Sequence, residues 1–164
     1  MKQRLTAWAV AAICLLAPVV AMAQKDIHWR SSSVQGPRTP ATNTRLGVAI
    51  FGNAEPATYE RKVSPVGPPV AGKLPIRAET VFRFADGSTL TMHSTETINL
   101  TAQGTHGRDE WTGDGQIVGG TGRYQGANGN FTFRALMGLD RQADGLLGDG
   151  FLTGQGQYTL QNPQ

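Results

Sequence analysis

The stretch Gly119–Gly129 reads GGTGRYQGANG and separates two strand-like runs, Gln116–Val118 and Asn130–Leu136. Glycine at this density indicates a backbone that takes positive φ angles or passes close to another segment. A nucleotide-binding loop does not fit, because the spacing differs from G-x-G-x-x-G, no helix follows, and no Lys-Ser or Lys-Thr pair completes a phosphate loop. The stretch therefore predicts a tight turn that packs Tyr124 against the neighbouring strands.

Two segments upstream of this stretch, Ile76–Phe84 and Leu90–Ile98, alternate with a period of two. A two-residue loop between them would turn their apolar faces in opposite directions. A three-residue loop, Ala85-Asp86-Gly87, pairs Phe82 with Leu90 and brings both apolar faces to one side. It also places the loop glycine in the left-handed position of a type I turn followed by a G1 bulge. We therefore predict a hairpin with the three-residue loop.

The remainder of the chain also predicts strands separated by glycine and proline turns. Lys25–Asn43 has neither a period of two nor one of 3.6 and is predicted to be a loose arm. Ser64–Pro75 holds four prolines and is predicted to be a loop or edge segment. Further strands are expected at Arg45–Phe51, Thr58–Val63, Trp111–Val118, Asn130–Met137 and Leu146–Leu160. No amphipathic helix of three turns is found, so the fold class is an all-β sandwich or barrel.

The first residues predict a cleaved leader. Lys2 and Arg4 precede the apolar run Ala7–Val20, and Ala21-Met22-Ala23 is a small-x-small cleavage site. We expect a signal peptide over residues 1–23, a flexible arm over residues 24–43 and one barrel domain over residues 44–164. The protein is then secreted or periplasmic. Cys14 follows a large residue inside the leader, so no lipid anchor on the membrane is expected.

Composition narrows the class of protein. A mature chain of 141 residues suits one domain and, having no cysteine, needs a core large enough to be stable without disulfides. Without Lys2 and Arg4, the chain has thirteen basic and twelve acidic residues and is nearly neutral. No concentrated basic face with aromatic readers is present, so nucleic-acid binding is not expected.

The run Gly119–Phe133, GGTGRYQGANGNFTF, resembles the glycine-rich signature of the allene oxide cyclase and dirigent superfamily of β-barrels. The matching positions are Gly119, Gly120, Thr121, Gly122, Arg123, Tyr124, Ala127 and Gly129. The resemblance covers roughly half of the chain, from about Ile76 onward, and implies an eight-stranded antiparallel barrel that is often trimeric. No catalytic residue of the family matches a motif here, so the resemblance implies a fold and no particular activity.

Glu96 is the candidate catalytic residue. The hairpin register puts it on the apolar face of its strand, where a carboxylate is costly unless it is paired or hydrogen-bonded. Alternatively it lies near the strand end and reaches water. Arg134 is a candidate partner in either case. The three histidines lack metal-site spacing, and neither a metal nor another cofactor is expected.

The candidate ligand-binding residues are mainly apolar: Phe82, Met92, Trp111, Phe133, Arg134 and Tyr158. The aromatic rings of the chain either line a ligand cavity or fill the barrel as a packed core. The interior of an eight-stranded barrel has room for side chains or for one small ligand. Three functions remain open. The protein binds a small, largely apolar ligand oriented by Glu96 or Arg134; it is an enzyme that steers the cyclisation or coupling of a reactive intermediate; or it is a packed structural or interaction barrel.

Overall fold

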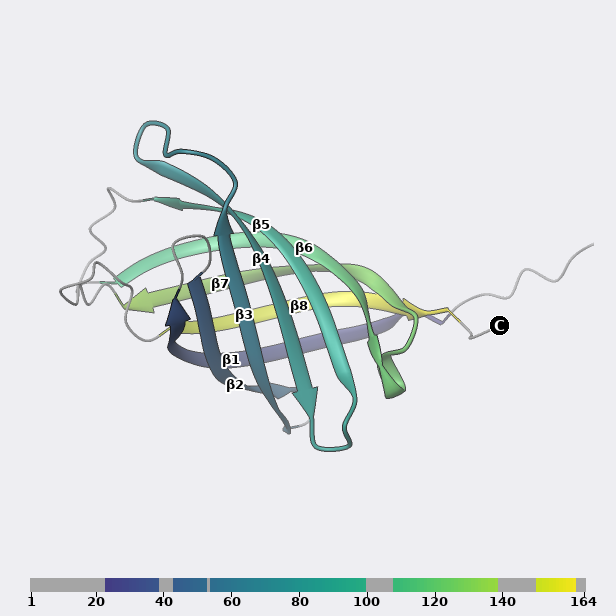
Figure 1. Cartoon of the computed structure of the whole chain (residues 1–164). Coiled ribbons are helices and arrows are strands. Elements are labelled where there is room, and N and C mark those ends of the chain that lie inside the picture. The colour runs from purple at the N-terminus through teal and green to yellow at the C-terminus, as the bar shows by residue number, and fades with distance from the viewer. Residues whose placement is uncertain (1–22, 39–42, 53, 100–107, 139–149, 162–164) are drawn as a thin grey trace, which may run out of the picture.

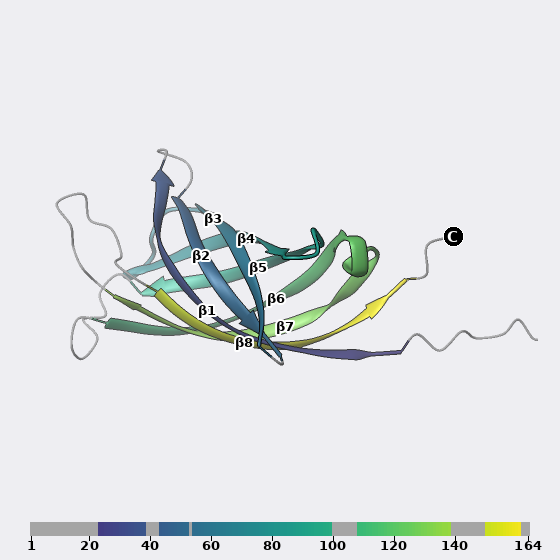
Figure 2. The ribbon, with the colours of Figure 1, turned by 90° about the horizontal axis from the view of Figure 1, so that it is seen from below.

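The computed structural model describes residues 23–38, 43–52, 54–99, 108–138 and 150–161. Within them the strands form one closed antiparallel barrel in which β1 pairs with β8 (Figures 1 and 2). The elements are β1 (Lys25–Arg38), β2 (Asn43–Phe51), β3 (Glu55–Pro65), β4 (Lys73–Phe84), β5 (Thr89–Asn99), β6 (Arg108–Thr121), the 3-10 helix η1 (Gly122–Tyr124), β7 (Ala127–Gly138) and β8 (Gly150–Leu160). The all-β, eight-stranded antiparallel barrel expected from the sequence is therefore confirmed.

The first strand corrects one sequence prediction. The flexible arm expected over residues 24–43 is wrong, because Lys25–Arg38 forms β1, which pairs with β8 from Lys25 to Ser33 and with β2 from Trp29 to Arg38. Ile27 and Trp29 point inward and are followed on the same face by the buried Ser31 and Ser33. Serine at these inward positions hid the period of two. Without β1 the barrel would remain open between β2 and β8.

The hairpin between β4 and β5 has the predicted three-residue loop. Phe82 lies opposite Leu90, the N–H of Gly87 donates to the carbonyl of Phe84 at 3.0 Å, and the N–H of Phe84 donates to the carbonyl of Ser88 at 3.0 Å. Gly87 has φ +81°, the left-handed conformation that the G1 bulge requires. The register prediction is confirmed, and the apolar side chains on both strands face the core.

Aromatic rings fill the middle of the barrel. Trp29 meets Phe51, Phe82 and Phe131 with ring centroids 5.6–6.1 Å apart. Inward-facing glycines on β6 and β8 leave space for such rings: a Cβ at Gly154 would lie 2.1 Å from Cζ2 of Trp29. The glycines of β8 therefore accommodate large side chains from the neighbouring strands β1 and β7 and do not open an empty chamber.

The two ends of the barrel differ. We call one the closed end, where the β2–β3 turn, the β4–β5 hairpin and η1 meet. We call the other the mouth, where β1, β3, β5 and β7 end and β2, β4, β6 and β8 begin. Within the described residues, no helix has the length and hydropathy needed to span a membrane. The predicted signal peptide lies, apart from its last residue, in residues 1–22, outside the described part of the chain.

Candidate ligand site at the mouth of the barrel

A cavity of about 60 Å³ opens at the mouth, between inward side chains of β1 to β5, β7 and β8. Its walls are mostly apolar, with Ile76, Ile98, Phe133 and Met137 among them. Polar groups interrupt these walls at a few positions: Ser33, Asn43, Arg45, Tyr59, Arg61 and Glu96. Apolar walls with a few placed polar groups are typical of small-molecule sites.

Glu96 reaches the cavity because β5 alternates, with Met92, Ser94 and Glu96 all facing inward. Its side chain has no exposed surface. The hydroxyl of Ser94 donates to Oε1 of Glu96 at 2.5 Å, and Nη2 of Arg61 forms an ion pair with the same oxygen. The carboxylate is thus held from two directions and does not reach water as one reading of the sequence allowed.

Arg61 is the partner that sequence reasoning missed. It lies on β3 with a side chain only 12% exposed, and its Nη1 donates to Oγ1 of Thr80 at 3.2 Å. Its guanidinium also stands 5.5 Å from the centre of the Phe133 ring, a distance at which cation–π attraction operates. Thr80, Glu96 and Phe133 together fix the orientation of this cation at the cavity.

A second arginine, Arg45 on β2, also lines the cavity and is only 5% exposed. Its Nε donates to the hydroxyl of Ser33 at 3.0 Å and its Nη2 to the Ser33 carbonyl at 3.3 Å. A buried arginine at an inward strand position is uncommon. Arg45 begins the predicted strand Arg45–Phe51, so the sequence placed it in a strand. It was missed as a site residue because a basic residue at a strand end is usually solvated.

The predicted ligand-binding residues are spread over the barrel. Phe133 lines the mouth cavity, whereas Phe82 and Met92 lie deeper, in the packed core around a void of about 20 Å³. Arg134 is exposed on the outer face of β7, away from Glu96. The side chain of Trp111 is outside the described part. Their roles in binding stay predictions.

A larger hollow lies on the outer face of β6, β7, β8 and β1. It measures about 790 Å³, is open to solvent, and is lined by exposed polar side chains such as Asn130, Gln155 and Gln157. Solvated side chains lose hydration on binding without a buried partner to replace it. The smaller mouth cavity, with its buried charges, is therefore the better candidate site.

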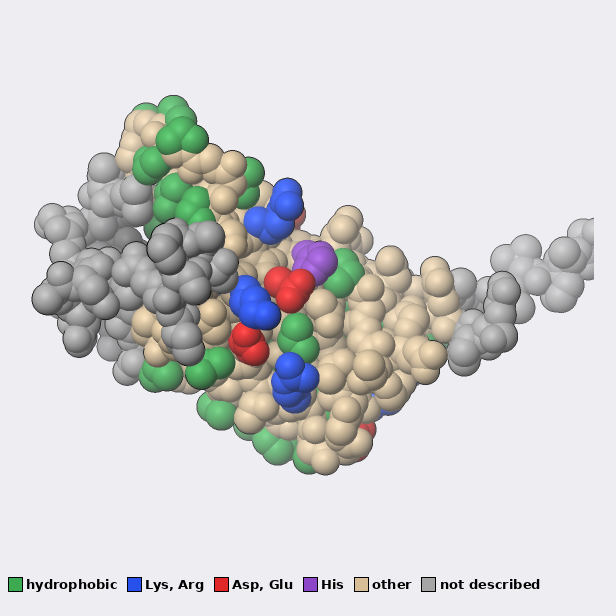
Figure 3. Space-filling view, viewed as in Figure 1, with side chains coloured by type: hydrophobic (Ala, Val, Ile, Leu, Met, Phe, Trp, Pro, Cys, Tyr) green, Lys and Arg blue, Asp and Glu red, His purple; other side chains and the backbone are tan. Residues whose placement is uncertain are grey.

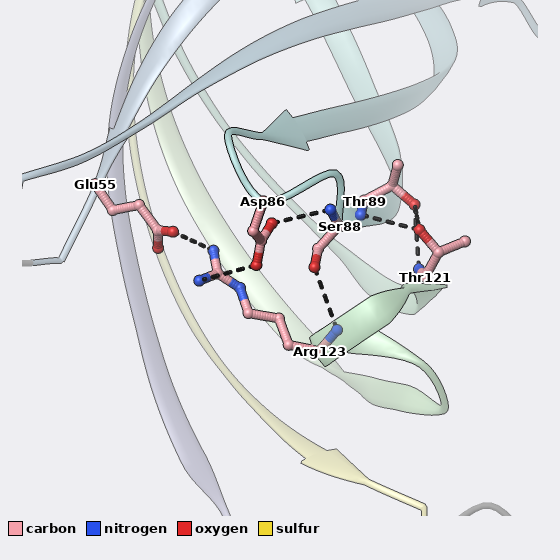
Figure 4. Close-up of polar contacts among 6 residues, drawn as sticks. All are labelled: Glu55, Asp86, Ser88, Thr89, Thr121 and Arg123. Carbon is pink, nitrogen blue, oxygen red and sulfur yellow. Dashed lines mark hydrogen bonds and ion pairs between the residues drawn. The ribbon is translucent and has the colours of Figure 1, made fainter.

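The glycine-rich motif lies at the closed end, far from this cavity. Arg123 forms an ion pair with Glu55, and its Nη1 lies 3.7 Å from Oδ2 of Asp86 in the β4–β5 hairpin (Figure 4). Its guanidinium stacks 4.6 Å from the Phe84 ring centre and 5.0 Å from that of Tyr124. One side chain thus ties η1 to the start of β3 and to the hairpin.

Shorter hydrogen bonds complete this tie (Figure 4). The N–H of Ser88 donates to Oδ1 of Asp86 at 2.9 Å, which lowers the pKa of that carboxyl. The N–H of Arg123 donates to the Ser88 hydroxyl at 3.3 Å, and the hydroxyls of Thr89 and Thr121 lie 2.9 Å apart. The motif therefore has a structural task here.

Tyr124, the last residue of η1, closes this end of the barrel. It is buried and packs against Phe84 and Tyr158, with ring centroids 5.0 and 5.8 Å apart. Burial raises the pKa of both tyrosine hydroxyls. Tyr158, predicted to bind ligand, thus lies at the closed end, opposite the mouth cavity.

No group of acidic, cysteine or histidine side chains in the described ranges is arranged to hold a metal ion. His93 on β5 is half-exposed and lies 3.3 Å from Glu79. Basic, acidic and histidine side chains are intermixed over the outer face of β3 to β5 (Figure 3). That face is a solvated surface that carries both signs of charge.

A scan against protein-family models and a search of curated proteins each found no match. A search of solved structures matched, among others, the pterocarpan synthase dirigent protein GePTS1. That match has a TM-score of 0.48 and 11% sequence identity, and covers 87% of this chain and 88% of that chain. The assignment of this chain to the eight-stranded antiparallel barrels rests on its own strand pairing.

Proposed function

We propose that this protein is a secreted or periplasmic barrel that binds a small, largely apolar molecule at its mouth. The observation that carries the proposal is the buried Arg61–Glu96 pair, which faces a cavity with apolar walls. Burying two charges costs free energy that a packed apolar pair would not. A ligand that interacts with those charges would explain why the barrel keeps a buried ion pair at this position.

The size of the cavity limits what enters. About 60 Å³ is well below the several hundred Å³ of pockets that enclose a drug-sized molecule. Only one end of the ligand therefore fits between Ile98, Phe133 and Met137. The rest of the molecule would lie across the mouth.

The experiment is native mass spectrometry of the protein purified from its own exported fraction. The mature chain should begin at Gln24 and carry an extra small mass. Val63→Trp would fill the edge of the cavity, since Val63 lines it, and should release that mass. Val66→Trp is the matched control because Val66 is exposed and lies outside the cavity. A wild-type protein without any bound mass would favour the packed structural barrel instead.

An enzyme that steers a reactive intermediate is the second candidate. It is favoured by the fixed carboxylate of Glu96, held by Arg61 and Ser94 beside apolar walls. Positioned charges in a water-poor site are the means by which such enzymes act. Glu96→Gln separates the two candidates. An enzyme would lose its turnover in this variant and still bind the ligand. A binding protein would show no turnover in either the wild type or the variant.

We also propose that the barrel assembles as a homotrimer. Outward apolar side chains gather on neighbouring strands: Val34 on β1, Leu46, Val48 and Ile50 on β2, and Phe151 on β8. The strand register pairs Val34 with Leu46. Ser32 on β1 pairs with Val48 on one side and with Phe151 on the other, so Val48 and Phe151 flank it. We call these five residues the outer apolar patch. A contiguous exposed patch of this kind supports self-association.

A further inference from the structure

Two arginines stand directly opposite each other inside the mouth. Arg45 on β2 is the cross-strand partner of Arg61 on β3, and both side chains line the same cavity. Directly opposed residues have Cβ atoms about 5 Å apart, and like charges in such a pair destabilise a sheet. The barrel keeps this unfavourable pair in its interior, where repulsion is screened less than at the surface.

Each guanidinium is held in place by neighbouring groups. The hydroxyl and carbonyl of Ser33 accept from Arg45, and Thr80 and Glu96 accept from Arg61. Glu96 is the one carboxylate among the described residues that line the cavity, against these two guanidiniums. The described lining of the cavity thus has more positive than negative charge.

We propose that the mouth cavity binds the carboxylate of an otherwise apolar molecule, seated between Arg45 and Arg61. This inference rests on the proposed function and adds the charge of the ligand's head group. Guanidinium groups donate in a planar fork that matches a carboxylate, and such bonds are about twice as strong as those between neutral groups. A bridging anion also removes the repulsion between the two cations.

The size and the walls of the cavity agree with this ligand. About 60 Å³ holds on the order of four water molecules, enough for a carboxylate and its first carbons. The rest of the cavity lining is largely apolar and includes Ile98, Met137 and Leu152. An alkyl or aryl body would contact these side chains while its head group meets the guanidiniums.

The experiment compares octanoate with octan-1-ol, which have the same chain and differ in head-group charge. Isothermal titration calorimetry at pH 7 should show octanoate binding at least tenfold more tightly. Arg45→Met should remove most of that preference, because the affinity for octanoate falls toward that for octan-1-ol. Arg83→Met is the matched control, because Arg83 is exposed on the outer face of β4. Circular dichroism checks that each variant is folded.

A second measurement needs no variant. At pH 4 octanoate is mostly protonated, and its preference over octanol should disappear while octanol binding persists. Equal affinity for the two probes at pH 7 would overturn the carboxylate assignment and leave the apolar-ligand proposal standing. If neither probe binds, the mouth is not a site for such molecules and both proposals fail.

Discussion

The Arg61–Glu96 pair places two charges inside the barrel, where removing each ion from water costs several kcal/mol. Attraction within the pair, the bond to Thr80 and the bond from Ser94 offset that cost. Well-packed apolar side chains of the same volume often give equal or greater stability. A buried ion pair of this kind does not maximise the stability of the fold. Features that lower stability are found mainly at functional sites.

Breaking this pair should be far more damaging than replacing it. Arg61→Met leaves the buried Glu96 carboxylate without its guanidinium, and we expect the free energy of unfolding to fall by about 3–5 kcal/mol. Adding Glu96→Leu to the same chain removes the stranded charge and should restore most of that loss. Urea unfolding followed by tryptophan fluorescence measures both changes.

The matched control lies one residue along the same strand. Lys62 and Glu60 are 3.5 Å apart, with side chains 55% and 35% exposed. Lys62→Met should change the free energy of unfolding by less than about 1 kcal/mol, as is usual for surface pairs. If Arg61→Met is as mild as Lys62→Met, the pair is not buried in solution and the proposed site loses its basis.

Alternation predicted one half of this pair and could not predict the other. Glu96 follows Met92 and Ser94 on a strand whose inward face is marked by the hairpin, so its direction could be inferred from the sequence. Arg61 lies in a predicted strand too short to define a face. Arg134 was the expected partner, but it occupies the outer face of β7.

At the scale of elements, registers are predictable where side chains mark both faces. β4 and β5 carry large apolar residues on one face and a glycine that fits a single loop type, so only one pairing buries them all. β1 offers no such contrast, because Ser31 and Ser33 face the interior. Small polar residues fit there because their hydroxyls find partners inside, as Ser33 does with Arg45. Such partners become visible only once the barrel is closed.

Gly87 tests the hairpin register. A Cβ at Gly87 would meet nothing within 4 Å, so Gly87→Ala costs only the strain of a left-handed backbone, about 1–2 kcal/mol. Gly67 also has open space around it and does not adopt the left-handed conformation. Gly67→Ala should therefore be neutral or slightly stabilising. Thermal unfolding of both variants gives the comparison, and equal shifts would mean that Gly87 is not left-handed in solution.

At the scale of the whole molecule, structural and functional tasks are divided between the two ends of the barrel. The glycine-rich motif, continuous in sequence, ties the closed end together through Arg123, and a continuous motif can be recognised without a structure. The mouth takes Ser33, Arg45, Arg61 and Glu96 from four strands, and closure of the barrel alone brings them together. This difference explains why the sequence predicted the fold well and the site only through Glu96 and Phe133.

The proposed trimer requires the outer apolar patch to lie in the interface between its subunits. Val48 lies in the middle of the patch and is 59% exposed, so Val48→Lys should leave the monomer fold intact. In a trimer the new charge is buried three times without a designed partner, which costs far more than it does in the monomer. We expect light scattering after gel filtration to give three chain masses for the wild type and one for Val48→Lys. Val118→Lys, at an exposed valine on β6, should remain trimeric, and a wild-type monomer at tens of micromolar would refute the assembly.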